Sequence, residues 1–444
     1  MTTSLNWTLA TVAAATGGVV DGDPTMPVRA ISTDSRMAEP GAVFVALRGA
    51  QHDGHDHAAA AVATGAVAAL VERGTHPELV PRIDVDDTST ALRDLAAHRR
   101  SELHMPVVAV TGSTGKTSTK DLLAAAIPGS WASPRSYNNE IGVPLTVLGT
   151  PEAASALVIE VGSRGIGHIR WLMPAIRPSV GIITNLGLVH LETFGSRDAI
   201  ADGKWELIEG LSVGDTAILP DDEPRLDRPH PGPTVTFGTG PGSVVRISDL
   251  TSDAAGRPSF VLHTEGRCFP VTLLMAGAHN AFNAAAALAA AMSIGVPAET
   301  AVAGMASAGG SEWRMEVHTG CFTVVNDAYN ANPTSMEAAL RTVSAMPGRS
   351  FAVLGEMAEL GPATVPEHER IGRLAADLGI EEVVTVGADH GLAEAAGGHH
   401  MVDPADAFEW IQDRVRDGDV VLVKASRSVG LEELATRLAE EAAP

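Results

Sequence analysis

One segment limits the possible folds of this chain more than any other. Residues 107–117 read Val-Val-Ala-Val-Thr-Gly-Ser-Thr-Gly-Lys-Thr. The apolar run predicts a buried strand, and the glycine-containing turn after it predicts a loop that leads into a helix. The backbone N–H groups of such a turn and the positive end of the helix together attract an anion. The segment therefore predicts an α/β fold with a phosphate-binding loop.

The end of this loop carries the residues that we expect to handle ATP. Lys116 would reach the terminal phosphates, and the Thr117 hydroxyl would be a ligand of Mg²⁺. Val110 stands where the usual P-loop has its first glycine, so the loop is tighter than that pattern. A strand–turn–helix without a ligand is the alternative. The predicted nucleotide-binding residues of the loop are Gly112, Ser113, Thr114, Gly115, Lys116, Thr117 and Ser118.

The rest of the chain alternates apolar strands with helical segments, which predicts parallel sheets covered by helices. We expect a small α/β N-terminal domain over residues 1–104, with an Ala-rich core helix spanning residues 58–71. Residues 105–312 would form a doubly wound ATP-binding domain with a β-rich excursion at 214–275. Residues 313–444 would form a Rossmann-like C-terminal domain. Its expected strands are 323–326, 351–355, 383–386 and 420–424.

Composition narrows the possible partners and the compartment. The net charge of −23 argues against binding to nucleic acid or to anionic membranes. Cys268 and Cys321 stand far apart, so we expect two buried thiols in a reducing cytoplasm and no disulfide framework. We see no signal peptide at the N-terminus and expect a cytoplasmic monomer.

Two side chains at strand ends are candidate metal ligands. Residues 156–160 end an apolar strand in Glu160, and His190 follows the apolar strand that begins at Val180. Ligands of open α/β sheets bind at the carboxyl ends of strands, so both side chains and Lys116 would meet in one crevice. A carboxylate and an imidazole beside phosphate suit Mg²⁺ or Mn²⁺. Alternatively, Glu160 caps a helix and His190 is an ordinary loop histidine.

Lysine is rare in this chain. Only Lys116, Lys120, Lys204 and Lys424 occur among the 31 basic residues. If a general bias favours arginine, the remaining lysines should be enriched where a guanidinium cannot replace a primary amine. Lys204 lies in a predicted helix, and the alternative for it is an exposed helix lysine.

These motifs and several others resemble the Mur ligases over nearly the whole chain. In the order of that family they are Thr111–Thr117, Asn138–Pro144, Glu160, Asn185–Glu192, Lys204, His279–Ala284, Trp313–Arg314, Asn326–Pro333 and Lys424–Ser428. The resemblance implies an ATP-dependent amide ligase with three domains and two Mg²⁺ sites. It also implies that CO₂ converts Lys204 to a carbamate that supports the second Mg²⁺, and it places Asn139 with the catalytic residues.

Within the family, three segments resemble the branch that joins D-alanyl-D-alanine to a UDP-linked muramoyl tripeptide. They are residues 137–145, 327–336 and 354–361. The Asp-Asn-Pro-Arg motif usual in the branch that adds diaminopimelate or lysine is absent. Such a sibling ligase, or a non-catalytic nucleotide-binding homologue, remains the alternative. Glu140 and residues 220–223 depart from the usual pattern without touching the expected catalytic set.

The resemblance assigns substrates to further residues. ATP, the UDP-linked muramoyl tripeptide and D-alanyl-D-alanine would meet at one site, and the tripeptide carboxylate would pass through an acyl phosphate. The expected nucleotide-facing residues are Asn283, Arg314, Asp327 and Asn330, and the last two alternatively fix a turn. The expected dipeptide-binding residues are Lys424, Ser426 and Arg427. The expected uridine-diphosphate-binding residues are Ser32, Asp34, Ser35, Arg36, Asp53, Gly54 and His55. The cluster of His52, His55 and His57 could indicate a zinc site, but a turn in a substrate-binding loop explains these histidines.

Overall fold

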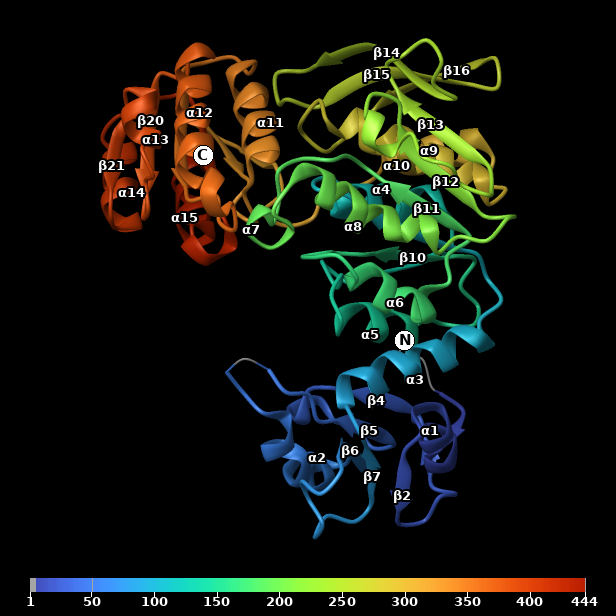
Figure 1. The fold of residues 1–444 in the computed structure, drawn as a ribbon. Helices are drawn as coiled ribbons and strands as arrows, with labels where there is room; N and C mark the ends of the chain where they lie inside the picture. The colour runs from blue at the N-terminus through green and yellow to red at the C-terminus, as the bar shows by residue number, and fades with distance from the viewer. Residues whose placement is uncertain (1–4, 50, 444) are drawn as a thin grey trace. The chain divides into compact units, whose positions relative to one another are not determined.

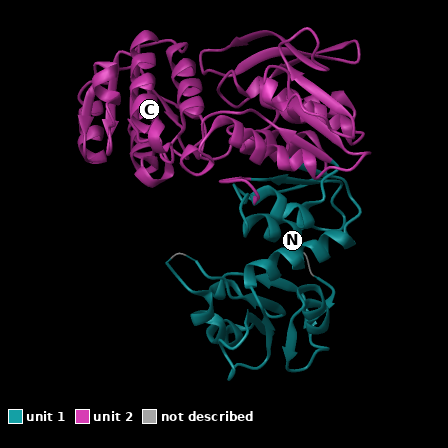
Figure 2. Cartoon of the chain, in the orientation of Figure 1, with its two compact units in different colours: residues 1–109, 129–161, 168–179 teal, residues 110–128, 162–167, 180–444 magenta. Residues whose placement is uncertain are grey.

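The computed structural model describes residues 5–49 and 51–443. The chain forms two compact units, which Figure 2 shows in different colours. Unit 1 contains residues 1–109, 129–161 and 168–179, and unit 2 contains residues 110–128, 162–167 and 180–444. Strand β8 (Val107–Thr111) passes from unit 1 into unit 2. The expected α/β class is confirmed, whereas the three domain boundaries stay a prediction.

Unit 1 is built on a five-stranded sheet with the order β2-β7-β6-β5-β4. All neighbours in it are parallel except β2 and β7. Unit 1 also contains the antiparallel pair β1–β3 and the parallel pair β9–β10, which is the end of a separate sheet. The strands are β1 (Trp7–Thr8), β2 (Val19–Asp21), β3 (Pro27–Val28), β4 (Ala30–Ser32), β5 (Ala42–Val45), β6 (Ala68–Glu72), β7 (Arg82–Val85), β9 (Trp131–Ala132) and β10 (Leu157–Glu160).

Helix α3 is the long helix of unit 1. Asp87 caps its first turn by accepting a hydrogen bond from the Thr90 amide at 2.6 Å. Its apolar face packs against α5 and α6, and Arg99 on that face is 2% exposed. Arg99 donates to the Thr150 carbonyl at 3.1 Å and pairs with Glu102 at 2.9 Å, so its buried charge is compensated. The helices are α1 (Leu9–Thr16), η1 (Ser35–Met37), η2 (Gly54–His57), α2 (Ala58–Thr64), α3 (Thr88–Glu102), α5 (Gly142–Leu148) and α6 (His168–Ile176).

Two expectations from the sequence are wrong. The single Ala-rich helix expected over residues 58–71 ends as α2 at Thr64, and residues 68–72 form the buried strand β6. Gly65 has a φ of 140°, a conformation that ends the helix, and a short Ala/Val run has no period that separates helix from strand. Cys268 and Cys321, expected to be buried, are both exposed. Cys268 lies on a strand of the β-rich excursion, and Cys321 lies in a turn.

The first sheet of unit 2 contains the β-rich excursion. Strands β11 to β14 are parallel neighbours, and β14, β15 and β16 continue as antiparallel neighbours. Helix α9 packs against this sheet and against α4, which follows the phosphate loop (Figure 1). The elements are α4 (Lys116–Ala126), β11 (Val180–Ile183), α7 (Leu191–Phe194), α8 (Arg197–Glu209), β12 (Thr216–Pro220), η3 (Pro224–Leu226), β13 (Thr234–Gly238), β14 (Val245–Ser252), β15 (Pro258–Thr264), β16 (Arg267–Thr272), α9 (Asn280–Ser293) and α10 (Ala298–Ala306).

The second sheet of unit 2 has the order β17-β18-β22-β19-β20-β21. Only β17 is antiparallel to its neighbour. The residues of α11, α12 and α13 belong to the core on one face, and those of α14 and α15 to the core on the other. The elements are β17 (Glu316–Thr319), β18 (Thr323–Asn326), α11 (Pro333–Ser344), β19 (Ser350–Gly355), η4 (Gly361–Ala363), α12 (Thr364–Asp377), β20 (Glu382–Val386), α13 (Leu392–Ala396), β21 (His399–Met401), α14 (Pro404–Gln412), β22 (Val420–Lys424), η5 (Arg427–Val429) and α15 (Glu432–Ala442).

The topology of this second sheet predicts where a ligand would bind. The chain leaves β18 and β19 toward helices on one face, and it leaves β22, which lies between them, toward α15 on the other face. Ligands of doubly wound sheets bind at the carboxyl ends of strands where the chain direction switches in this way. The loops after β18, β19 and β22 are therefore the expected lining of a site.

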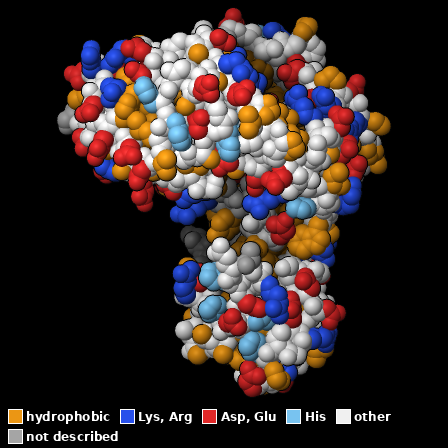
Figure 3. Space-filling view, turned by 60° about the vertical axis from the view of Figure 1, so that its left-hand side comes forward, with side chains coloured by type: hydrophobic (Ala, Val, Ile, Leu, Met, Phe, Trp, Pro, Cys, Tyr) orange, Lys and Arg blue, Asp and Glu red, His pale blue; other side chains and the backbone are white. Residues whose placement is uncertain are grey.

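The surface carries both charge signs. On the face shown in Figure 3, acidic and basic side chains are interspersed. Within the described residues, none of the helices combines the length and apolar composition needed to cross a bilayer.

The close packing of α10 on α4 can be tested at Gly304. A Cβ atom there would lie 2.0 Å from the Ala125 carbonyl oxygen of α4. We expect Gly304→Ala to lower the thermal midpoint, because overpacking costs about 1–3 kcal/mol. Gly309→Ala is the matched control, because no atom lies within 4 Å of its Cβ position. Equal midpoints for the two variants, measured by circular dichroism, would contradict the close approach of the helices.

Candidate active site

The phosphate loop is formed as expected between β8 and α4. Gly115 precedes the helix with a left-handed φ of 78°, and α4 begins at Lys116. The Lys116 ammonium donates to the Gly112 carbonyl at 2.8 Å. Thr117 is buried in the first turn of the helix, at 2% exposure. The loop therefore presents a helix N-terminus and an ammonium group together, which is the arrangement that binds phosphate.

Two glycines of the loop cannot carry a side chain. A Cβ at Gly112 would lie 1.8 Å from the Thr184 hydroxyl, and one at Gly115 would lie 2.4 Å from Asn283 Oδ1. Both glycines also have positive φ, at 149° and 78°. Asn283, expected to face the nucleotide, thus lies directly against the loop.

Sequence reasoning gave no role to the side chains that hold the loop from the end of β11. Asn185 Oδ1 accepts from the Thr114 amide at 3.0 Å, and Asn185 Nδ2 donates to the Thr114 hydroxyl at 2.8 Å. The Thr184 hydroxyl donates to the Thr114 carbonyl at 2.6 Å. Ser113 Oγ donates to the carbonyl of Gly187 at 2.9 Å. Polar residues directly after an apolar strand were the available signal for them.

Lys116, His190 and Lys204 are brought together in unit 2. Burial lowers the pKa of Lys204 well below its usual range, and the nearby Lys116 charge lowers it further. Burial also lowers the pKa of His190. The Glu359 carboxylate opposes that shift, whereas the charges of Lys116 and Lys204 add to it. These groups therefore form a cluster that favours anions over further cations.

Lys204 is not the exposed helix lysine of the alternative reading. It lies on the buried face of α8 and is 1% exposed. Within residues 5–49 and 51–443, its ammonium has no hydrogen bond and no ion pair. A buried charge without a partner is expensive, so burial favours the neutral form of the amine.

Glu160 ends β10 in unit 1 and is 1% exposed. Asn138 donates to its carboxylate at 2.6 Å. The next helix, α6, begins only at His168, so Glu160 does not cap it. Asn139 accepts from the amides of residues 141 and 142 at the start of α5. Because both residues belong to unit 1, their approach to Lys116 stays a prediction, as does the catalytic role of Asn139.

Of the expected nucleotide-facing residues after β18, Asp327 is buried and Asn330 is exposed. Asp327 pairs with Lys424 at 2.5 Å and accepts from the Met315 amide at 3.0 Å. Lys424 also donates to the Asn330 carbonyl at 2.9 Å. Arg314 lies 3.9 Å from the centre of the Tyr329 ring. The turn-fixing alternative for Asp327 and Asn330 thus agrees with their contacts, and their nucleotide contacts stay predictions.

The three expected dipeptide-binding residues differ in accessibility. Lys424 is 1% exposed and is used in the pair with Asp327. Ser426 is buried and accepts from the Ala358 amide at 2.9 Å. The Arg427 side chain is 51% exposed, pairs with Glu432 at 2.9 Å and lies over the Trp313 ring. Of the three, Arg427 has the accessible cation, and the binding of a dipeptide by any of them stays a prediction.

The expected uridine-diphosphate-binding residues form two turns after the parallel strands β4 and β5 of unit 1. In the first turn, between Ser32 and η1, which begins at Ser35, the Arg36 side chain holds the pKa of Asp34 at about 2. In the second turn, Asp53 pairs with the His55 ring at 2.6 Å.

The second turn is further fixed by its own residues. His55 Nε2 accepts from the Glu72 amide at 3.0 Å, and a Cβ at Gly54 would lie 2.7 Å from the Leu47 backbone. Among the described residues, no group of three or more His, Cys, Asp and Glu side chains is placed to hold a metal. The contacts of the His55 ring with Asp53 and with the Glu72 amide give this residue a local structural role, and binding of a substrate by either turn stays a prediction.

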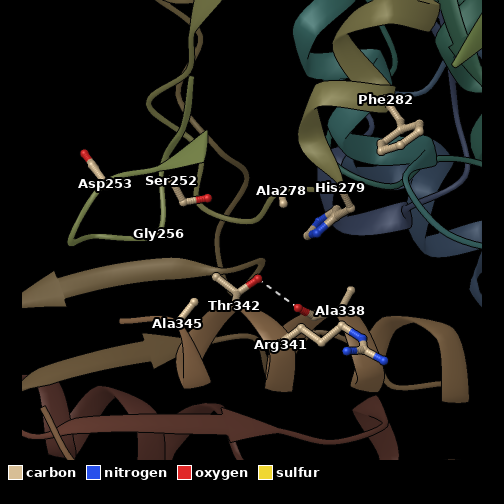
Figure 4. A pocket seen from close by; sticks show the side chains of 10 residues that line it. All are labelled: Ser252, Asp253, Gly256, Ala278, His279, Phe282, Ala338, Arg341, Thr342 and Ala345. Carbon is tan, nitrogen blue, oxygen red and sulfur yellow. Dashed lines mark hydrogen bonds between the residues drawn. The ribbon is translucent and has the colours of Figure 1, made fainter. Parts of the chain in front are cut away.

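A pocket that sequence reasoning did not identify lies beside the N-terminus of α9 (Figure 4). Its volume is about 310 Å³. Its lining residues are Ser252, Asp253, Gly256, Ala278, His279, Phe282, Ala338, Arg341, Thr342 and Ala345. His279 Nδ1 is buried and has no hydrogen-bond partner in the part of the chain that the structure describes. The pocket is thus mainly apolar, with an unpaired ring nitrogen beside it.

Three family models match the chain. The Mur ligase middle domain matches residues 110–291. The domain described as "Mur ligase, glutamate ligase domain" matches residues 313–427, and the one described as "Mur ligase family, catalytic domain" matches residues 27–100.

Full-length relatives and solved structures agree with these matches. The UDP-N-acetylmuramoyl-tripeptide--D-alanyl-D-alanine ligase of Mycobacterium leprae is 37% identical, over 93% of this chain and 93% of the relative. A crystal structure of MurF from Acinetobacter baumannii superposes with a TM-score of 0.91 at 32% identity, covering 99% of this chain and 100% of that one. MurF ligase from Thermotoga maritima in complex with ADP has a TM-score of 0.84 at 28% identity, covering 93% and 97%.

The close approach of Asn283 to the phosphate loop predicts the effect of a single methyl group. We expect Gly115→Ala to weaken ATP binding roughly tenfold or more, since each lost hydrogen bond to a charged group costs about 1.5–3 kcal/mol. Gly129→Ala is the matched control, because Gly129 has a φ of 77° and no atom closer than 3.6 Å to its Cβ position. Equal ATP affinities of the two variants in calorimetry would show that the approach to Asn283 is unimportant.

Proposed function

The chain belongs to the Mur ligase family, and from this we propose that it joins D-alanyl-D-alanine to UDP-N-acetylmuramoyl-tripeptide at the expense of ATP. The observation that carries the proposal is the cluster of Lys116, His190 and Lys204 beside the phosphate loop. This cluster supplies positive or hydrogen-bonding groups where a triphosphate would lie. We further propose that the protein acts in the cytoplasm on small-molecule substrates.

The reaction needs an activated carboxyl group, because a carboxylate does not condense with an amine in water. The terminal carboxylate of the tripeptide attacks the γ-phosphorus of ATP, the bond to the β-phosphate oxygen breaks, and ADP leaves. The amine of D-alanyl-D-alanine then attacks the acyl phosphate, forming the amide and releasing phosphate and a proton. The contribution of the loop and of Lys116 is to position the phosphates and to stabilise charge during the transfer.

The residues that would hold Mg²⁺ are Thr117, Glu160, His190 and carbamylated Lys204. Oxygen and imidazole donors suit this ion. Mg²⁺ sites in phosphoryl-transfer enzymes use few protein ligands and complete their shell with phosphate oxygens and water. Bound Mg²⁺ would offset the charge of the phosphate oxygens.

The state of Lys204 supports the carbamate. Only a neutral amine attacks CO₂, and the pKa of Lys204 is well below its usual range. The new carboxylate would also place a negative charge beside Lys116, which removes the unfavourable meeting of two ammonium groups. A guanidinium would not undergo this reaction, which explains a lysine at this position in a chain with only four.

The pocket beside α9 is suited to the base of the nucleotide. A volume of about 310 Å³ with a mainly apolar lining accepts a planar heterocycle. His279 stands one helical turn before Asn283, which lies against the phosphate loop. We therefore place the adenine near His279 and the phosphates at Lys116.

A donor-swap assay tests the proposed substrate. Purified protein with ATP and UDP-N-acetylmuramoyl-tripeptide should release phosphate when D-alanyl-D-alanine is added, and much less with diaminopimelate or lysine. Release with a single amino acid in place of the dipeptide would favour a sibling ligase. No release with any donor would favour a non-catalytic homologue.

Carbamylation of Lys204 predicts a dependence on bicarbonate. Protein freed of dissolved CO₂ should lose turnover and regain it with bicarbonate, and ¹³C-bicarbonate should give a carbamate signal by NMR. Lys204→Met, which keeps the buried volume, should lose on the order of 10²-fold or more and not respond. Asp202→Asn, an exposed position on the same helix, is the control that should respond as wild type does. A bicarbonate response in Lys204→Met would exclude the carbamate.

A further inference from the structure

His190 is held by a side chain that the reaction scheme above does not use. Its ring Nδ1 is hydrogen-bonded to the carboxylate of Glu359, which lies between β19 and η4. The Glu192 amide, in the first turn of α7, donates to the Glu359 carbonyl at 3.2 Å. The loop that carries His190 is thus bound to the segment after β19 by both a side chain and the backbone.

The backbone at this contact has an unusual conformation on both sides. His190 has a φ of 50° and Glu359 has a φ of 63°, both in the left-handed region that non-glycine residues rarely adopt. Such conformations persist where the surrounding structure imposes them, and they are concentrated at functional sites. Nearby, Gly361 has a φ of 54°, and its Cβ position lies 3.2 Å from Glu192 Cα. The two segments therefore fit closely.

The hydrogen bond determines which ring nitrogen of His190 is available. An ionised carboxylate only accepts hydrogen bonds, so with Glu359 ionised and the ring neutral, Nδ1 would be the donor and Nε2 would keep its lone pair. Within the described residues, no hydrogen bond is made by Nε2. The charges of Lys116 and Lys204 act on the same ring. The imidazole of His190 therefore lies within electrostatic range of both lysines at the phosphate loop.

We propose that Glu359 is a positioning residue that fixes the tautomer and orientation of His190 for its contact with the metal–triphosphate, an inference that rests on the proposed function. A histidine that binds a metal commonly donates its other N–H to a carboxylate, which orients the ring and raises its basicity. Here the carboxylate comes from the predicted C-terminal domain, and the imidazole from the predicted central domain. Docking of the segment after β19 onto α7 would thus complete the metal site.

The test compares three variants of the full-length protein. Glu359→Ala removes the acceptor, and Glu359→Gln keeps a neutral acceptor. Glu369→Ala is the control, because Glu369 is similarly exposed, at 43% against 48%, and its one ion pair within the described residues is with Arg373 on its own helix. Circular dichroism and thermal midpoints establish that each variant is folded.

The first measurement is the tautomer of His190 by ¹⁵N NMR of histidine-labelled protein, with the signal identified by its loss in His190→Gln. We expect the Nδ1–H form in wild type, Glu359→Gln and Glu369→Ala, and an increased Nε2–H form in Glu359→Ala. The second measurement is Mn²⁺ affinity in the presence of a non-hydrolysable ATP analogue. It should fall about 10- to 100-fold in Glu359→Ala and less in Glu359→Gln.

An unchanged tautomer together with an unchanged Mn²⁺ affinity in Glu359→Ala would overturn the proposal. So would equal losses in Glu359→Ala and Glu369→Ala, since these would reflect a general loss of negative charge. Neither measurement requires ligation. If wild type released no phosphate with any donor, the proposed function would fail, and the two measurements would still decide the role of Glu359.

Discussion

The burial of the Lys204 amine beside Lys116 is the constraint on which the candidate site depends. Two ammonium groups close to each other repel, and the structure gives the buried Lys204 no carboxylate partner within the described residues. Such a cluster is more stable when one amine is neutral and when anions bind to it. Binding of a triphosphate at the loop and the proposed carbamylation of Lys204 would both meet this requirement. The repulsion between the Lys116 and Lys204 amines would thus favour binding of a triphosphate at the loop. The same repulsion would favour the reaction of the Lys204 amine with CO₂.

The phosphate loop is held in place by contacts with neighbouring elements. Thr184 and Asn185 tie Thr114 to the end of β11, and Asn283 of α9 leaves no space for a side chain at Gly115. These contacts fix the direction of the backbone N–H groups before any ligand binds, which reduces the cost of ordering a loop around phosphate. The buried side chains of α9 are mostly alanines, and their small size allows this helix to approach both α4 and the sheet.

The sequence predicted correctly those elements that local residues determine. It did not predict the elements and contacts that depend on residues far away in the chain. The apolar strands at 323–326 and 420–424 match β18 and β22, and the phosphate loop follows directly from its glycines and lysine. Residues 58–71 were misjudged because an Ala/Val run has no period, and only packing in the sheet made residues 68–72 a strand. Glu359 lay within a recognised segment, but nothing local indicated that it would meet His190, 169 residues away in the chain. The approach of Glu160 to Lys116 and Lys204 also depends on contacts between distant parts of the chain, and it stays a prediction.

The scarcity of lysine has an effect beyond the catalytic pocket. Three of the four lysine side chains are buried, and the fourth, Lys116, is only partly accessible in the phosphate loop. The exposed permanent cations of the described surface are therefore guanidinium groups, which keep their proton at any pH that a protein tolerates. In alkaline solution, where most proteins lose ammonium charge and become steadily more anionic, this molecule should keep nearly all of its positive charge. Its colloidal behaviour there should change little, and amine-directed labels should find few sites on its exterior.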